Sequence, residues 1–250
     1  MSGRLAHIFR HPIKSHGREA LASVVLSPGA SLPWDRHWAI AHEAARLPDD
    51  GGWAPCMNFC RGAKAPDLMA IDCSFDAASG RITLTHPDRP AITLDPETEA
   101  EQLIDWMRPL IPADRAGPAR VYRATGRGLT DTPEPSISIL SLASNAALGA
   151  AMGLDLSILR WRGNLWIDGW DAWAEEALPG QRVKIGAAVL RVTEQITRCR
   201  ATTVNPATGR IEGDTLAALT ALRGDPVFGL YATVETGGPI APGDGVEILP

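Results

Sequence analysis

Hydrophobic and polar residues alternate along this chain over short segments that are separated by turn residues. Between residues 81 and 85, isoleucine and leucine alternate with arginine and threonine, which is typical of a half-buried strand. Apolar or alternating segments of this kind, which we predict to be strands, span residues 5–9, 21–26, 38–42, 68–73, 81–94 (a hairpin), 136–142, 160–167, 181–185, 188–192, 227–235 and 245–249. The 24 glycines and 20 prolines interrupt the chain often. The pattern predicts a mainly β (α+β) protein with a few helices.

Two segments favour helices instead. Residues 98–108 place apolar side chains at helical spacing behind an acidic first turn, which complements the helix dipole. Residues 143–152 are rich in alanine, and Ser141 or Ser144 is the expected N-cap. Residues 111–134 are rich in proline, glycine and arginine and contain no long apolar run. We therefore expect this stretch to join two units.

Composition excludes several classes of protein. The 250 residues suffice for one large β domain or two modest ones. The formal net charge of −5 gives no electrostatic footprint for nucleic acid. No apolar run approaches the length of a membrane span, the first residues lack a signal-peptide core, and four cysteines do not suggest a disulfide scaffold. We expect a cytoplasmic protein.

Cys199 is the strongest candidate for chemistry. It lies between Arg198 and Arg200, and adjacent cationic groups favour the thiolate, the form of a cysteine that attacks or binds metal. A polar loop with a proline follows, so we expect the cysteine where a strand leaves the core. Residue chemistry alone leaves open a functional thiol or a small buried hydrophobe. A thiolate would suit a soft metal, whereas zinc would need further ligands nearby. Cys56 and Cys60 are predicted to be structural thiols.

Short motifs around and beyond Cys199 resemble the MOSC family, named for the C-terminal domain of molybdenum cofactor sulfurases. The matching segments are Arg198-Cys199, residues 204–209, residues 219–223, residues 228–231 and residues 243–246. Near the N-terminus, residues 11–15 (His-Pro-Ile-Lys-Ser) and 35–38 (Asp-Arg-His-Trp) resemble the β-barrel domain that precedes MOSC in the amidoxime-reducing proteins. Each motif is short, but together they follow the family order over nearly the whole chain.

This resemblance implies a fold and an activity. It implies an N-terminal MOSC-type β-barrel domain in residues 1–110, packed on a C-terminal MOSC β-barrel in residues 111–250. The relatives are the mitochondrial amidoxime-reducing component and bacterial reductases of N-hydroxylated compounds. They imply an oxidoreductase that reduces a small N-hydroxylated substrate and takes electrons from an external flavoprotein or ferredoxin-like protein. The family also has an association with pyridoxal phosphate binding.

The resemblance also implies a molybdenum cofactor, Mo-molybdopterin, with Cys199 as the catalytic residue and metal ligand. The implied cofactor-binding residues are Lys14, Ser15, Arg36, Ser136, Arg162, Asn164, Thr197, Arg198 and Tyr231. We expect the three arginines of this set to converge on one anionic ligand. The residues alone leave open that Arg36 pairs with Asp35 or Glu43 on the surface. Two other functions stay open: a cofactor carrier or sulfur-transfer protein that uses a Cys199 persulfide, and a pterin-binding protein without turnover.

Overall fold

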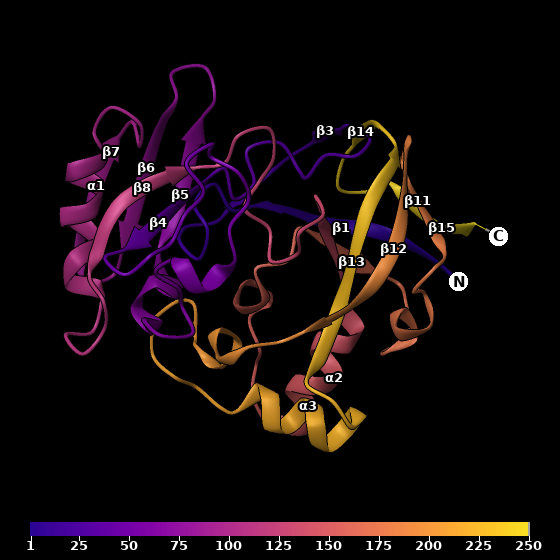
Figure 1. Ribbon diagram of the computed structural model, residues 1–250. Coiled ribbons are helices and arrows are strands. Elements are labelled where there is room, and N and C mark those ends of the chain that lie inside the picture. The colour runs from indigo at the N-terminus through magenta and orange to yellow at the C-terminus, as the bar shows by residue number, and fades with distance from the viewer. Residues whose placement is uncertain (250) are drawn as a thin grey trace.

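The computed structural model describes residues 1–249 and confirms a mainly β fold with three α-helices. Its main feature is a ring of seven strands that closes on itself, because β1 pairs with both β10 and β15 (Figure 1). In order around the ring the strands are β1 (Ser2–Arg10), β10 (Leu165–Asp168), β9 (Ile137–Ser141), β13 (Val227–Thr236), β12 (Ala188–Thr197), β11 (Arg182–Ile185) and β15 (Gly245–Leu249). Only the neighbours β9 and β10 run parallel. The first strand of the chain thus completes a barrel whose other strands all follow residue 136.

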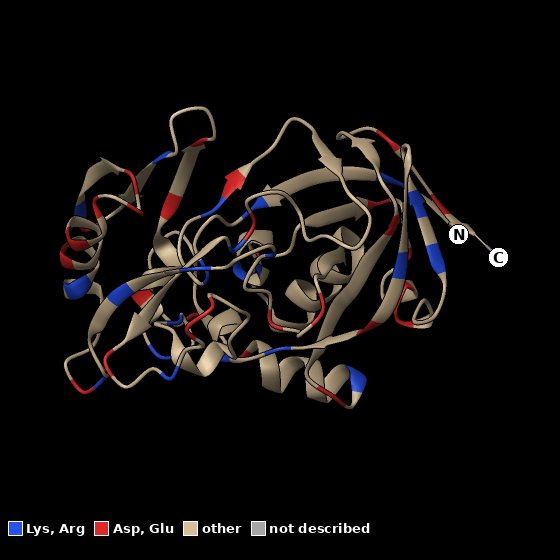
Figure 2. Cartoon of the chain, turned by 45° about the horizontal axis from the view of Figure 1, so that its top comes forward, with Lys and Arg blue, Asp and Glu red and all other residues tan. Residues whose placement is uncertain are grey.

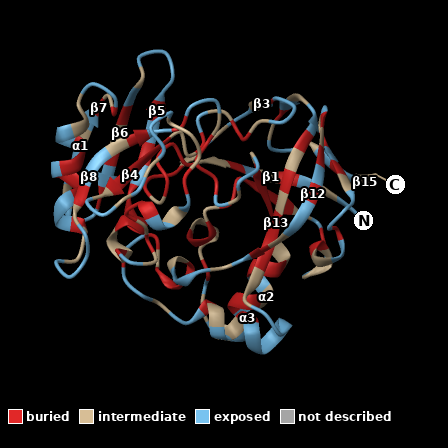
Figure 3. Ribbon diagram, in the orientation of Figure 1, coloured by how far each residue is buried: buried red, intermediate tan, exposed pale blue. Residues whose placement is uncertain are grey.

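The barrel is filled by alternate side chains of its strands. Along β12 and β13, residues such as Leu190, Val192, Leu230 and Val234 are buried in one apolar cluster. Burying one such side chain contributes about 1.5–3 kcal/mol, so the period of two in the sequence fixes which face of each strand points inward. Figure 3 shows buried positions recurring along these strands, whereas α3 (Thr215–Arg223) is largely exposed.

A second unit is built from residues between β1 and β9. It contains a pair of strands, β4 (Trp38–His42) with β8 (Pro118–Arg123), and a meander of β5 (Asp72–Asp76), β6 (Arg81–His86) and β7 (Arg89–Leu94). Helix α1 (Ala100–Met107) closes the unit, and its Leu103 and Met107 are fully buried. The remaining strands are β2 (Glu19–Ala20), which pairs with β1, and the pair β3 (Val24–Leu26) and β14 (Gly238–Ile240).

Two predictions about elements need correction. The strand expected at 68–73 is a 3₁₀ helix, Pro66–Ala70, followed by β5, and a proline in the first turn suits that helix. The strand expected at 160–167 is another 3₁₀ turn, Ile158–Trp161, with β10 only from Leu165. β8 lies inside the stretch 111–134 that we expected to join two units, and the sequence did not predict it as a strand. The proposed division near residue 110 stays a prediction.

Helix α2 (Leu142–Met152) has Ser141 as its N-cap, since the Ser141 side chain accepts a hydrogen bond from the Ser144 amide at 3.3 Å. Charged residues of both signs are scattered over strands and loops (Figure 2). Within residues 1–249, no helix is long and apolar enough to cross a membrane.

Candidate functional site

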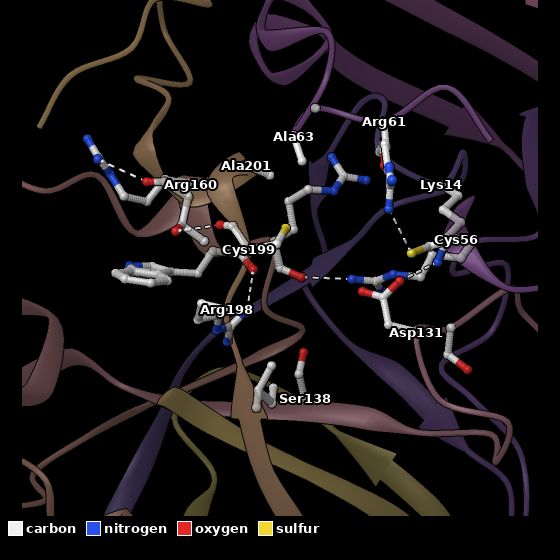
Figure 4. A pocket seen from close by; sticks show the side chains of 18 of the residues that line it. Lys14, Cys56, Arg61, Ala63, Asp131, Ser138, Arg160, Arg198, Cys199 and Ala201 are labelled. Atoms are coloured by element: carbon white, nitrogen blue, oxygen red, sulfur yellow. Dashed lines mark hydrogen bonds and ion pairs between the residues drawn. The ribbon is translucent and has the colours of Figure 1, made fainter. Parts of the chain in front are cut away.

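A cavity of about 270 Å³ lies where the second unit meets the barrel. All ten residues that the sequence singles out line it: Lys14, Ser15, Arg36, Ser136, Arg162, Asn164, Thr197, Arg198, Cys199 and Tyr231. Most of them lie at or just beyond strand ends, so the strand pairings bring segments far apart in the chain to one place. Figure 4 shows Arg198 and Cys199 facing Lys14, Cys56 and Arg61 across this space. The individual roles of these residues stay predictions.

Cys199 has a fixed backbone and a free thiol. It lies two residues beyond the end of β12, whose buried Ile196 is the last core residue of the strand, which confirms that the cysteine lies where a strand leaves the core. Its carbonyl accepts hydrogen bonds from the amide and the hydroxyl of Thr202, both at 3.1 Å. The residue itself is exposed, and within residues 1–249 its sulfur has no hydrogen-bond partner. The sulfur is therefore held at the cavity wall and is available to a ligand.

Arg198 is held by two carbonyl groups and keeps one unused donor. Its Nε donates to the Phe228 carbonyl at 2.7 Å and its Nη1 to the Trp161 carbonyl at 3.0 Å. Its guanidinium also lies over both aromatic rings, 5.4 Å from that of Trp161 and 5.9 Å from that of Phe228. Nη2 is buried and has no partner among the described residues. Burial lowers the pKa of Arg198 to about 10, so the protein alone solvates this charge poorly. An anion in the cavity would satisfy the free donor.

Arg36 is anchored by a buried carboxylate rather than by a surface pair. Its Nη1 donates to Asp35, whose side chain is fully buried, and its Nη2 donates to the Arg162 carbonyl at 2.9 Å. Asp35 also accepts a hydrogen bond from the His11 amide at 2.7 Å. Burial alone would raise the pKa of Asp35, but Arg36 and His11 hold it well below its usual range. The Arg36–Asp35 pair therefore fixes the arginine from behind the cavity.

Arg162 crosses from the barrel to the loop that follows β1. Its Nη1 donates to the Gly17 carbonyl at 3.0 Å and its Nη2 to the Ile13 carbonyl at 3.2 Å. Burial and the nearby Arg36 charge lower the pKa of Arg162 to about 9. Both effects disfavour its positive charge, and a bound anion would offset them.

Three of the predicted site residues have left-handed backbone conformations, with φ of 65° at Ser15, 52° at Arg36 and 51° at Arg162. Only five non-glycine residues in the described chain have positive φ. Such conformations cost about 1–3 kcal/mol each and concentrate at functional sites. The strain is thus stored at the residues that present their side chains to the cavity.

Positive charge in the cavity exceeds the negative charge that the protein places there. Lys14 pairs with Asp131 at 2.5 Å and Arg160 with Glu212 at 2.9 Å. Arg61, Arg162 and Arg198 also line the cavity, and no carboxylate of residues 1–249 lies within 4 Å of their guanidinium groups. The excess charge suits an anionic ligand.

Sequence reasoning missed several lining residues: Cys56, Arg61, Asp131, Ser138 and Arg160. Cys56, which we grouped with the structural thiols, accepts a hydrogen bond from Arg61 Nη1 at 3.2 Å. Asn164 has a structural task, since its Oδ1 accepts hydrogen bonds from the Ser138 amide at 3.1 Å and hydroxyl at 2.9 Å. Its Nδ2 donates to the Phe9 carbonyl at 3.2 Å. Asn164 thereby joins β1, β9 and the start of β10.

The described residues contain no group of three or more His, Cys, Asp or Glu side chains that could hold a metal ion. A metal bound to Cys199 would therefore not find a full set of protein ligands among these side chains.

The charge excess predicts that inorganic phosphate stabilises the apoprotein. At about 100 times its dissociation constant, a ligand of the folded state adds about 2.7 kcal/mol, which for a chain of this size raises the melting temperature by roughly 5–10 °C. Differential scanning fluorimetry in phosphate, against sodium chloride of equal ionic strength, measures this shift. Arg198→Gln removes a charge-assisted donor and should weaken phosphate binding by about 10-fold, whereas the exposed Arg120→Gln should not. An equal rise in melting temperature in the wild type, Arg198→Gln and Arg120→Gln would contradict a shared anion site.

Comparison with known proteins identifies two family domains in the chain. The MOSC domain model matches residues 127–247, and the MOSC N-terminal beta barrel domain model matches residues 2–108. Among solved structures, the YuaD protein from Bacillus subtilis is 12% identical to this chain. The match covers 99% of this chain and 96% of the YuaD chain, with a TM-score of 0.48. YiiM from Geobacillus stearothermophilus is 16% identical. The match covers 46% of this chain and 54% of the YiiM chain, with a TM-score of 0.36. No curated protein matches the chain.

The family assignment rests on the two domain models, which together span most of the sequence. They occur in the order that the motifs imply, and each is consistent with the β-rich units described above. The chain therefore belongs to the MOSC-domain proteins and carries a MOSC N-terminal β-barrel domain ahead of its MOSC domain.

Proposed function

We propose that this protein is a molybdenum-cofactor-dependent oxidoreductase that reduces small N-hydroxylated compounds with electrons from a partner protein. MOSC domains are associated with binding of the molybdenum cofactor. One observation carries the proposal for this chain: a free, exposed thiol, Cys199, shares a cavity with arginines that lack carboxylate partners. A soft metal with an anionic organic ligand matches both features.

The residues present fit such a cofactor. Arg36, Arg162 and Arg198 would hold the phosphate and the pterin edge, because arginine forks suit planar and anionic groups. The buried, unpartnered Nη2 of Arg198 is the donor that most needs this ligand. Cys199 would supply the protein's sulfur ligand. When bound, the cofactor supplies a metal centre that exchanges two electrons with the substrate.

The protein residues supply position and protons. Reduction of an N-hydroxylated amine to the amine and water consumes two electrons and two protons. Burial and Asp131 raise the pKa of Tyr231 to about 12, so its phenol stays protonated at neutral pH and can donate a hydrogen bond to the substrate oxygen. The Lys14–Asp131 pair lines the same cavity as Tyr231. The electrons come from an external flavoprotein or ferredoxin-like donor under this proposal.

The decisive experiment uses protein expressed in a host that makes the cofactor. We expect molybdenum and pterin to copurify, and reduced methyl viologen to drive reduction of a simple aryl hydroxylamine or amidoxime. NADH alone should give no turnover, because no G-x-G-x-x-G follows a predicted strand in the sequence. Strong NADH-driven turnover, or a molybdenum-loaded protein that is inactive with viologen, would contradict the proposal.

A second function is favoured by the exposure of Cys199 and the free state of its sulfur. A carrier or sulfur-transfer protein would hold a persulfide on this cysteine. Cyanide-labile sulfur on metal-free protein, together with no viologen-driven turnover, would support this function over the reductase.

A further inference from the structure

A second cavity, of about 150 Å³, adjoins the first and is lined by residues of the second unit, the part of the chain between β1 and β9. Its apolar wall is formed by Phe59, Cys60 and Ala65, which are at most 6% exposed, together with the partly buried Ile111. An apolar cavity of about this volume accommodates one benzene-sized ring. Arg61 lines both cavities and therefore marks their junction.

The charged residues around the second cavity are all basic. Arg61, Lys64 and Arg115 line it, and its lining contains no carboxylate. Within residues 1–249, no carboxylate lies within 4 Å of the charged groups of Arg61 or Lys64. Arg115 pairs only with its neighbour Asp114 at 3.7 Å, and such exposed pairs contribute little. Among the described residues, the hydrogen-bond partner of the Arg61 guanidinium is the Cys56 sulfur, which is a weak acceptor.

His42 forms part of the wall and does not present a free ring nitrogen. Its Nε2 donates to the Met57 carbonyl at 2.7 Å, and its Nδ1 accepts from the Ala44 amide at 3.2 Å. The charged side chains that remain for a ligand are therefore the basic ones.

We propose that this second cavity binds a small anion that carries one ring-sized apolar group, such as an arylalkyl carboxylate. The ring occupies the pocket of Phe59, Cys60, Ala65 and Ile111, and the anionic group meets Arg61 and Lys64. This site goes beyond the proposed reaction, because its ligand requires neither the molybdenum cofactor nor Cys199. Its position beside the first cavity makes it suited to hold the body of a larger ligand that extends past Arg61.

The test compares three probes on the apoprotein by isothermal titration calorimetry and ligand-observed NMR. 3-Phenylpropionate has both ring and charge, 3-phenyl-1-propanol has the ring alone, and propionate has the charge alone. We expect 3-phenylpropionate to bind at least about 10-fold more tightly than either of the others, since a buried ring and a charge-assisted hydrogen bond each contribute more than 1.4 kcal/mol. Equal affinity for all three probes, or no binding to folded protein, would overturn the proposal.

Variants separate this site from the rest of the surface. Arg61→Gln and Lys64→Gln should each weaken 3-phenylpropionate by about 5- to 10-fold and leave 3-phenyl-1-propanol unchanged. Ala116→Trp, at an exposed lining position, should weaken both aromatic probes. The exposed Arg120→Gln and Lys184→Gln serve as charge controls and should bind like the wild type.

Cys199→Ser should also bind 3-phenylpropionate like the wild type, whether or not the protein is a reductase. Loss of binding in this variant, or equal losses in the controls and in Arg61→Gln and Lys64→Gln, would place the probe outside the second cavity.

Discussion

Replacement of Cys199 by serine should reduce viologen-driven turnover of an N-hydroxylated substrate by more than about 100-fold. Changing even a partner that only orients a metal ligand costs about 10- to 100-fold, so loss of the ligand itself should cost more. A serine hydroxyl keeps the size of the side chain but replaces the polarisable thiolate sulfur with an oxygen, which would change the electron density at a metal bound there. Turnover per molybdenum, with metal content measured on the same sample, gives the result.

The same substitution should leave the fold intact. The Cys199 side chain is exposed and has no hydrogen-bond partner in the described chain, so the free energy of unfolding should change by less than about 0.5 kcal/mol. Cys73→Ala is the matched control, because burial and Glu19 raise the pKa of the Cys73 thiol to about 12 and the residue lies outside the cavity. It should lose about 1 kcal/mol of stability and keep its turnover. Full activity of Cys199→Ser would rule out the ligand assignment.

Apolar and alternating segments predicted several strands with the observed bounds. Residues 38–42 and 245–249 were predicted as strands and coincide with β4, which is buried on both faces, and β15, where the buried Val246 lies between two exposed residues. β8 was missed because its pattern is carried by long polar side chains. Arg120 and Arg123 point outward from this strand while Tyr122 is buried, and a run of arginines and a proline contains too few apolar residues to indicate a strand.

The cavity could be located from the sequence only where motifs mark it. The motif order brought together Lys14, Arg36 and Cys199, which lie far apart along the chain but line one cavity. Cys56 and Cys60 look alike in sequence, yet burial raises the pKa of the Cys60 thiol to about 11 while Cys56 reaches the cavity and contacts Arg61. The difference depends on how one 3₁₀ turn, Cys56–Asn58, is held beside the end of β4, where His42 Nε2 donates to the Met57 carbonyl, and no local pattern encodes it.

Asp35 offers the second large effect, as a positioning residue for Arg36. Its carboxylate is fully buried and accepts hydrogen bonds from Arg36 and from the His11 amide. Asp35→Asn keeps the shape but leaves the Arg36 charge without its counterion. Removing one member of a buried pair costs about 3–5 kcal/mol, and we expect a loss in this range by urea unfolding. Asp168→Asn, which breaks the exposed pair with Arg4, should lose less than about 1 kcal/mol.

A purely structural role for Asp35 and a role in charging the cavity predict different responses to anions. In Asp35→Asn, Arg36 adds another unpaired positive charge to a cavity that already contains Arg162 and Arg198, so phosphate should raise the melting temperature more than in the wild type. The double variant Asp35→Asn with Arg36→Gln removes both charges of the pair. It should be more stable than Asp35→Asn alone and should gain less from phosphate than the wild type. An unchanged phosphate response across the three proteins would show that Asp35 supports the fold alone and that the charge of Arg36 does not reach the cavity.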